Sequence, residues 1–451
     1  MKRLLQYLTQ YKKECVLGPL FKLLEASFEL LVPLVMASVI DTGIKARDQG
    51  YIIQMCLVLV GLGVVGLACS ITAQYFAAKA SVGFAAQVRS ALFGHIQKLG
   101  FSELDKEGTA TLITRMTSDI NQVQNGMNLT LRLLLRSPFV VFGAMVMAFT
   151  IDWRAALVFA VAIPLLAAVV FGVMLWTMPR YKQVQAGLDK VLGAARENLT
   201  GVRVVRAFGR EEAEIEDFQQ GNNALTQLQV FVGRVSGLMN PVTYILINLA
   251  TLVLVWAGGL RVETGAITQG QVVALLNYMA QILVELVKLA NLIINITKAL
   301  ACANRVADVM DITPGMADRQ AGGGGQRPLP AGAGLPVEFV DVALHYQGAG
   351  AESLSRLSFS VAPGETVGII GGTGSGKTSL VNLIPRFYDC TGGQVLVGGK
   401  PVQDWPLEGL RAQVGVVPQR AQLFTGTIRE NLLWGCGDAS DEELWQALDT
   451  A

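Results

Sequence analysis

The stretch Val367 to Leu380, VGIIGGTGSGKTSL, decides the fold of the C-terminal part of the chain. It matches the pattern G-x-x-x-x-G-K-[ST], a glycine-rich loop between a strand and a helix, at Gly371, Gly376, Lys377 and Thr378. The apolar run VGII predicts the strand, and the run SLVNLI predicts the helix. A turn that precedes a lysine by chance is the alternative, but the flanking elements favour a phosphate-binding loop.

Such a loop predicts a nucleotide as the ligand. Glycines let several backbone N–H groups converge on one anion, and the helix that follows adds its positive N-terminal end. We expect the Lys377 ammonium group to contact the β- and γ-phosphates of ATP and the Thr378 hydroxyl to bind Mg²⁺. The residues expected to bind the nucleotide are Gly371, Gly372, Thr373, Gly374, Ser375, Gly376, Lys377, Thr378 and Ser379.

The composition indicates a membrane protein. Of 451 residues, 52% are apolar and 16% are charged, and the mean hydropathy is +0.44. The 36 basic and 35 acidic residues give a net charge of +1, so we expect no nucleic-acid partner. The six cysteines are scattered without paired spacing, which favours buried or free thiols over metal ligands or disulfides.

Six stretches approach the ~20 mainly apolar residues that a helix needs to cross a bilayer. They are residues 16–40, 54–78, 129–151, 155–178, 241–260 and 270–296. The third and sixth are weaker predictions because they carry charges, at Arg132, Arg136, Glu285 and Lys288. The first carries Lys22, Glu25 and Glu29, which makes it a poor signal peptide and part of the mature protein.

Charge asymmetry predicts the topology. Two long polar segments, 79–128 and 179–240, hold most of the basic residues between spans, so we expect both of them and both termini to be cytoplasmic. The absence of a targeting peptide suits a bacterial inner membrane. Apolar spacing in both segments, and the lack of proline from Lys182 to Met239, favour helices that continue the spans. Helices lying on the membrane surface are the alternative.

A soluble domain is predicted after the spans. The segment TPGMADRQAGGGGQRPLPAGAG is rich in glycine and proline and indicates a flexible linker. The following VEFVDVALHY alternates as a half-buried strand does, and a Pro-Gly turn separates two further predicted strands in LSRLSFSVAPGETVGII. We therefore predict an all-α six-helix transmembrane domain, a linker and a partial α/β P-loop nucleotide-binding domain, over residues 1–311, 312–334 and 335–451.

A second motif narrows the choice of protein family. The run VGVVPQRAQLFTGTIRENLLWG, Val414 to Gly435, places Gln419 at the end of a predicted valine-rich strand. With the phosphate loop and with Tyr346 after the first strand, it resembles the nucleotide-binding domain of ATP-binding-cassette (ABC) transporters. Six spans with two long cytoplasmic excursions are similar to the exporter-type half-transporters of multidrugs or lipids, so the resemblance covers essentially the whole chain.

The resemblance implies roles for particular residues. Tyr346 would stack on adenine, and Gln419 would be a catalytic residue that helps to coordinate Mg²⁺ and the attacking water. An ordinary strand aromatic and a solvated turn glutamine are the alternatives for these two positions. Residues 102–119 resemble the first coupling segment of the family, and residues 197–211 lie in the excursion that carries the second.

The chain departs from the family pattern at its C-terminus. The family's Leu-Ser-Gly-Gly-Gln motif, catalytic glutamate and switch histidine follow the Gln419 region, whereas the sequence ends at Ala451 and its histidines are His95 and His345. We therefore expect a truncated nucleotide-binding domain, inactive alone, from a transporter whose complete form is an ATPase.

The resemblance predicts a homodimeric or heterodimeric transporter that uses ATP to export a hydrophobic or amphipathic drug, lipid or peptide. The alternatives are a non-catalytic subunit of a heterodimeric exporter, and a nucleotide-gated regulator or channel that does not pump. Six spans exclude a soluble P-loop kinase. Charges within the spans point to the substrate: Glu285 and Lys288 form a possible pair, and Glu25 and Glu29 either face a cavity or are hydrated at the interface.

Overall fold

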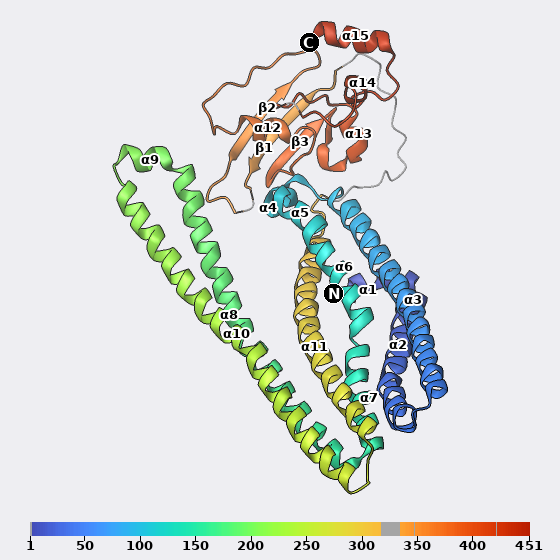
Figure 1. The fold of residues 1–451 in the computed structure, drawn as a ribbon. Helices are drawn as coiled ribbons and strands as arrows, with labels where there is room; N and C mark the ends of the chain where they lie inside the picture. The colour runs from blue at the N-terminus through green and yellow to red at the C-terminus, as the bar shows by residue number, and fades with distance from the viewer. Residues whose placement is uncertain (1, 317–333, 347, 421) are drawn as a thin grey trace. The chain divides into compact units, whose positions relative to one another are not determined.

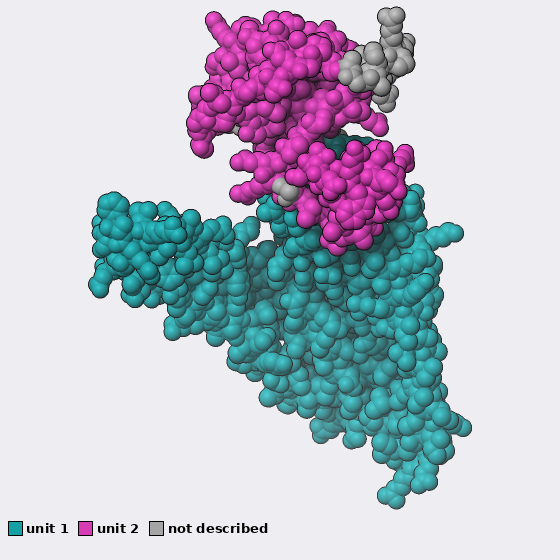
Figure 2. All heavy atoms as spheres, turned by 90° about the horizontal axis from the view of Figure 1, so that it is seen from above, with its two compact units in different colours: residues 1–98, 107–313 teal, residues 99–106, 314–451 magenta. Residues whose placement is uncertain are grey.

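The computed structural model describes residues 2–316, 334–346, 348–420 and 422–451. The chain divides into two compact units, coloured separately in Figure 2: unit 1 comprises residues 1–98 and 107–313, and unit 2 comprises residues 99–106 and 314–451. Most of the predicted linker, residues 317–333, lies outside the described residues.

Unit 1 is helical throughout. Its elements are α1 (Lys2–Leu5), η1 (Gln6–Tyr11), α2 (Lys12–Ser38), η2 (Val39–Ile44), α3 (Gln49–Ile96), α5 (Thr109–Thr114), η3 (Arg115–Asp119), α6 (Ile120–Leu133), α7 (Arg136–Ile151), α8 (Trp153–Thr200), α9 (Val202–Ala207), α10 (Glu211–Glu263) and α11 (Gln269–Met310). The one further helix before the linker, α4 (Phe101–Glu107), falls almost wholly in unit 2.

All six predicted spans are confirmed within longer helical stretches, and the third, 129–151, is interrupted by the two residues between α6 and α7. Within the described residues, six helical stretches are long and apolar enough to cross a membrane: Gln6–Ile44, Gln49–Ile96, Thr109–Ile151, Trp153–Thr200, Glu211–Glu263 and Gln269–Met310. At about 1.5 Å per residue, a helix of the length of α3 extends far beyond the ~30 Å hydrocarbon core of a bilayer. The helices therefore continue past the membrane, as expected for the long polar segments.

Side-chain caps explain where the long helices begin. Asp48 and Asp152 each accept a hydrogen bond from the backbone N–H three residues later, at the starts of α3 and α8. A capping box between Thr268 and Gln271 begins α11. Asp152 also accepts a hydrogen bond from Arg261 Nε at 3.1 Å, which ties the start of α8 to the end of α10.

Small residues let the helices of unit 1 approach closely. The fully buried Ala73 and Ala77 of α3 face α2, where a Cβ at Gly18 would lie 3.6 Å from the Ala77 nitrogen. The buried hydroxyl of Tyr278 in α11 donates a hydrogen bond to the Leu30 carbonyl oxygen in α2 at 2.6 Å. The main core combines α2, α7, α8, α10 and α11, and includes Ala26, Val140, Ala144, Phe159, Leu166, Leu254, Leu275 and Ile282.

The outward surface of α3 is apolar. Its most apolar stretch has a mean hydropathy of 2.5, yet only 6% of that stretch is buried within the protein. Side chains such as Leu57, Val60 and Ile71 therefore point away from the protein. A surface of this kind suits lipid and not water. The chain is a multi-pass membrane protein.

The second long excursion is a helical hairpin, in which α8 and α10 continue the neighbouring spans as predicted. In Figure 1, α8 and α10 run side by side, and the short α9 joins them at one end. The backbone leaves the helix at Gly201, and Gly209 adopts φ +60°, which favours glycine. Proline is therefore not the only helix breaker in this segment, because glycines reverse the chain.

Unit 2 contains a four-stranded sheet. Strand β1 (Val337–Leu344) pairs antiparallel with both β2 (Leu354–Val361) and β3 (Gly392–Val397), and β4 (Lys400–Pro401) follows at the edge, giving the order β2-β1-β3-β4. Phe339 lies opposite Phe359 in the ladder, and their rings stack with centroids 4.6 Å apart. The helices of unit 2 besides α4 are α12 (Lys377–Asn382), η4 (Val402–Asp404), α13 (Leu407–Arg411), α14 (Ile428–Leu432) and α15 (Asp441–Thr450).

Two predicted strands are not formed. The run before the phosphate loop and the valine-rich run before Gln419 join no sheet among the described residues. Their apolar side chains are correspondingly unpacked, with Ile370 and Val417 each 96% exposed. An apolar run favours a strand, but a strand also needs a hydrogen-bonded neighbour, and neither run has one here.

Candidate nucleotide site and membrane charge cluster

The phosphate loop has a backbone shape that only glycine permits at several positions. Gly374 and Gly376 adopt φ +83° and +85°, in the left-handed region. A Cβ at Gly371 would lie 2.6 Å from Ser375 Oγ, and a Cβ at Gly376 would lie 2.9 Å from the Ser353 carbonyl oxygen. The predicted helix follows as α12, so the loop and helix of the motif are both present.

Lys377 lies over the loop that precedes it. Its Nζ donates hydrogen bonds to the carbonyl oxygens of Gly371 at 2.8 Å and Gly372 at 2.7 Å, and to Ser375 Oγ at 3.3 Å. Within the described residues, no backbone hydrogen bond uses the N–H of Gly374 or Gly376. An ammonium group and free N–H groups on one short loop can receive the oxygens of a phosphate.

Tyr346 lies beside the helix that follows the loop. Its hydroxyl donates a hydrogen bond to Ser379 Oγ at 2.9 Å, and its ring meets that of Tyr388 edge to face, with centroids 5.1 Å apart. The structure thus brings two of the sequence-predicted binding residues, Tyr346 and Ser379, together. Stacking of the half-buried Tyr346 ring on adenine stays a prediction.

Gln419 is not joined to the phosphate loop. Its side chain is exposed after the unpaired run 414–418, and it makes no hydrogen bond to the loop within the described residues. The Thr378 hydroxyl is exposed at the start of α12. The Thr378 hydroxyl and the Gln419 side-chain carbonyl are oxygen ligands of the kind that Mg²⁺ prefers. Their roles as Mg²⁺ ligands stay predictions.

The helix α4 packs on unit 2, to which residues 99–106 belong. Tyr388 donates a hydrogen bond from its hydroxyl to Asp105 Oδ2 at 2.5 Å, and the Phe101 ring lies 4.7 Å from that of Phe387. Burial, and next the hydrogen bond to Asp105, raise the pKa of Tyr388 above its ordinary value. The phenol therefore stays protonated at neutral pH. The sequence marked this helix as a coupling segment but gave no sign of its aromatic partners.

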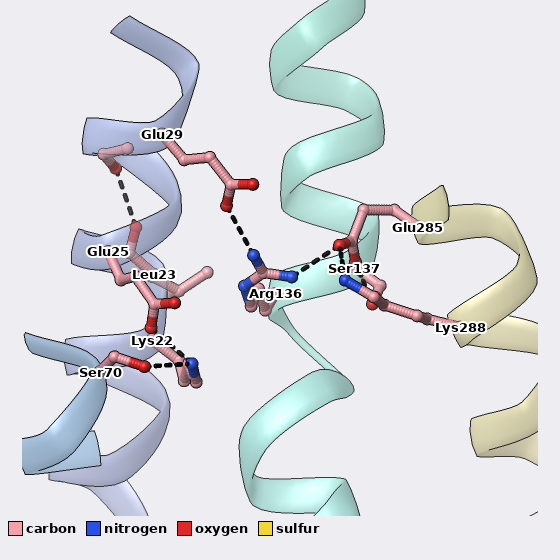
Figure 3. Close-up of polar contacts among 10 residues, drawn as sticks. Lys22, Leu23, Glu25, Glu29, Ser70, Arg136, Ser137, Glu285 and Lys288 are labelled. Atoms are coloured by element: carbon pink, nitrogen blue, oxygen red, sulfur yellow. Dashed lines mark hydrogen bonds and ion pairs between the residues drawn. The ribbon is translucent and has the colours of Figure 1, made fainter. Parts of the chain in front are cut away.

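Unit 1 holds a charge cluster, defined here as Glu29, Arg136, Ser137, Glu285 and Lys288 (Figure 3). Arg136 lies between two acidic residues: Nη2 donates to Glu29 Oε2 and Nη1 donates to Glu285 Oε1, each at 2.6 Å. Lys288 Nζ donates to Glu285 Oε1 at 2.8 Å, and Ser137 Oγ donates to Glu285 Oε2 at 2.8 Å. The predicted Glu285–Lys288 pair is confirmed.

The partner of Glu29 was not foreseen. In the sequence Arg136 was only a charge that weakened the prediction of the third span, although a charge within a span needs a partner. Glu25, one turn before Glu29, pairs instead with Lys22 at 2.5 Å. Arg136 is the first residue of α7, which follows a two-residue break after α6. Two carboxylates offset the unfavourable placement of a cation at a helix N-terminus.

Six membrane-crossing helices followed by a phosphate loop define a membrane protein that binds a nucleotide. Residues 15–286 match the family described as ABC transporter transmembrane region, and residues 354–451 match the family described as ABC transporter. The chain belongs to the ABC transporter family. One membrane region and one nucleotide-binding region in a single chain agree with an exporter-type half-transporter.

Similar proteins come from several bacteria. The chain is 34% identical to the uncharacterized ABC transporter ATP-binding protein YfiB of Bacillus subtilis, over 100% of this chain and 78% of that protein. It is 32% identical to an uncharacterized ABC transporter ATP-binding protein of Mycobacterium tuberculosis, over 99% of this chain and 76% of the relative. An ATP-dependent lipid A-core flippase of Chromobacterium violaceum is 28% identical, over 100% of this chain and 76% of the relative.

Proposed function

We propose that this chain is one half of a dimeric transporter that uses ATP to export a hydrophobic or amphipathic molecule. The observation that carries the proposal is the phosphate loop, with Lys377 held over the carbonyl groups of Gly371 and Gly372, in the same chain as six long apolar helices. The family of the chain supports nucleotide binding.

The residues of unit 2 suit the binding of Mg-ATP, which is the first step of ATP hydrolysis. Lys377 exchanges its contacts with loop carbonyls for phosphate oxygens, and the N–H groups of Gly374 and Gly376 hold the same anion. Thr378 and Gln419 supply oxygen ligands for Mg²⁺, which neutralises charge on the phosphates. Gln419 must move toward the loop to do so. Tyr346 offers a ring face to adenine.

Two helix tips link nucleotide binding to the spans in this proposal. The first is α4, which is anchored through Asp105 and Phe101 to the aromatic pair Tyr388 and Phe387. The second is α9, whose neighbouring Phe208 is exposed. We propose that α9 packs on the nucleotide-binding domain of the second half-transporter, either an identical copy or a related chain. Movement of that domain then shifts the spans.

The proposed class of transported substrate rests on two observations. A named relative is a lipid A-core flippase, which supports transport of an amphipathic lipid. The spans carry a buried polar cluster beside apolar walls, which suits a molecule with a polar head. The basic long segments and the bacterial relatives support a bacterial inner membrane with both termini cytoplasmic.

Transport into proteoliposomes that contain the complete ATPase form of the transporter tests the proposal. We expect translocation of a fluorescent phospholipid or a lipophilic dye that requires Mg-ATP and is abolished by Lys377→Ala. Lys400→Ala, a lysine of the same unit outside the loop, is the control and should retain transport. Nucleotide binding without any ATP-dependent translocation would contradict export, and would favour a nucleotide-gated regulator or a non-catalytic subunit.

A further inference from the structure

The charged residues of the six predicted spans do not balance. The spans contain four basic and three acidic residues: Lys22, Arg132, Arg136, Lys288, Glu25, Glu29 and Glu285. Three of the basic residues form ion pairs with the three acidic ones. Arg132, near the C-terminal end of α6, is the basic residue left over. The spans therefore carry one positive charge that none of their acidic residues neutralises.

The Arg132 guanidinium has no partner in the protein. Within the described residues, Arg132 makes neither a hydrogen bond nor an ion pair. Its Nε is buried, whereas Nη1 and Nη2 retain accessible surface on a half-buried side chain. A guanidinium is always protonated in proteins, and an unpaired cation within a span is costly. The two Nη groups are therefore open to an anion from outside the chain.

An exposed apolar stripe begins one turn after Arg132 and continues along α7. It consists of Leu135, Phe139, Phe142 and Val146, whose spacing of three or four residues places them on one helix face. Each of these side chains is between 39% and 62% exposed. A cation at one end of an exposed apolar face is complementary to a molecule with an anionic head and an apolar tail.

We propose that Arg132 and this stripe bind an anionic lipid of the surrounding bilayer. Phosphate oxygens of the lipid head group accept hydrogen bonds from Nη1 and Nη2, in the two-pronged geometry that a guanidinium favours. An acyl chain lies on Phe139, Phe142 and Val146. Arg132 is close to the start of the third predicted span, 129–151, so the head group stays near the edge of the hydrocarbon core while the chain enters it. The inference concerns lipid binding and holds whether or not the lipid is transported.

Lipid binding to the purified protein in detergent tests the inference. The protein is incubated with phosphatidylglycerol, whose head group is anionic, or with phosphatidylcholine, whose head group is neutral overall, and bound lipid is counted by native mass spectrometry. We expect phosphatidylglycerol to bind about tenfold more tightly than phosphatidylcholine. Glycerol 1-phosphate, which has the anionic group without acyl chains, should not bind at the same concentrations, because it lacks the apolar contacts.

Matched variants locate the bound lipid. Arg132→Gln leaves no protein group unpaired, and it should reduce the preference for phosphatidylglycerol from about tenfold to less than twofold. The control Arg234→Gln removes an exposed arginine of α10 outside the predicted spans and should keep the preference. Val146→Ser should weaken phosphatidylglycerol binding about threefold, whereas Val60→Ser, at a similarly exposed position of α3, should not. Gel filtration and thermal unfolding confirm that each variant is folded.

Three results would overturn the inference. The first is a preference for phosphatidylglycerol that survives in Arg132→Gln, which would mean that water alone solvates the guanidinium. The second is an equal loss of preference in Arg132→Gln and Arg234→Gln, which would indicate a general attraction between basic side chains and anionic lipid. The third is binding of glycerol 1-phosphate as tight as that of phosphatidylglycerol, which would make the site one for a free anion.

Discussion

Arg136 and Glu285 form a buried ion pair between α7 and α11, with 2.6 Å between Nη1 and Oε1. The pair joins a helix that begins inside the third span to the sixth span found in the described residues. Glu29 of α2 completes a bridge across three helices. Because buried ionic groups are costly when unpaired, the pair constrains how these helices pack.

Loss of the Glu285 charge should destabilise the membrane unit strongly. In Glu285→Gln, Arg136 keeps only Glu29, and we expect a loss of about 3 kcal/mol in the free energy of unfolding. The control Lys288→Met removes a side chain that is 43% exposed and leaves the Arg136 pair intact, so it should cost about 1 kcal/mol or less. Thermal unfolding of both variants in detergent tests this, and similar losses would contradict it.

The phosphate loop should tolerate alanine at one glycine and not at another. Gly376 has φ +85°, and its added Cβ would lie 2.9 Å from the Ser353 carbonyl oxygen. Gly376→Ala should therefore destabilise unit 2 by about 2 kcal/mol. At Gly372 nothing lies within 4 Å of an added Cβ, so Gly372→Ala should change stability by about 0.5 kcal/mol or less. Equal effects in chemical denaturation would show that the loop has another shape.

The Tyr388–Asp105 hydrogen bond should hold α4 in place. Tyr388→Phe keeps the ring but loses one hydrogen bond of about 1 kcal/mol, so amide exchange in Phe101–Glu107 should accelerate about fivefold. Tyr346→Phe loses its bond to Ser379 instead and is the control. Because the pKa of Tyr388 is raised in the folded protein, the hydrogen bond contributes fully below the ordinary tyrosine pKa near 10 and is lost as pH rises through the folded pKa. The ratio of exchange rates between Tyr388→Phe and wild type should therefore be the same at pH 7 and at pH 9. Unchanged exchange would contradict the contact.

Acid should fray the last helix at its start. The backbone N–H of Ser440, and next its hydroxyl, donate to Glu443 and hold the pKa of that carboxyl below its usual value of 4.5. A depressed folded pKa means that the stabilisation is present above about pH 4.5 and is lost as pH falls through the folded value. Glu443→Gln should speed Ser440 amide exchange at pH 6, whereas the control Glu442→Gln should not. A difference between wild type and Glu443→Gln that persists at pH 2 would contradict this prediction.

Much of the membrane unit could be predicted because a span needs a long apolar run, which local sequence contains. The long helices that continue the spans also followed from spacing and charge. The hairpin around Gly209 could not be predicted, since glycine within a helical pattern does not by itself specify a reversal of the chain. The bridge from Glu29 through Arg136 to Glu285 could not be predicted either, because it joins residues far apart in sequence.

The loop and the helix start of the candidate nucleotide site were predictable because one continuous segment supplies them. Gly371 to Ser379 form their loop and helix start through local contacts. The strands expected before the loop and before Gln419 depend on neighbours elsewhere, and without them Ile370 and Val417 stay exposed. The hydrogen bond from Tyr346 to Ser379 also joins distant segments, so only the residue types were visible in the sequence.

The affinity of the protein for Mg-ATP tests the central claim most directly. Equilibrium binding of a fluorescent ATP analogue would be measured for wild type, Lys377→Ala and Lys400→Ala. The account predicts that Lys377→Ala weakens binding at least tenfold, because the charged donor over Gly371 and Gly372 is lost, while Lys400→Ala binds as wild type does. Equal affinity in all three proteins would show that the Val367–Leu380 loop does not hold the phosphates, and would contradict ATP-driven export by this chain.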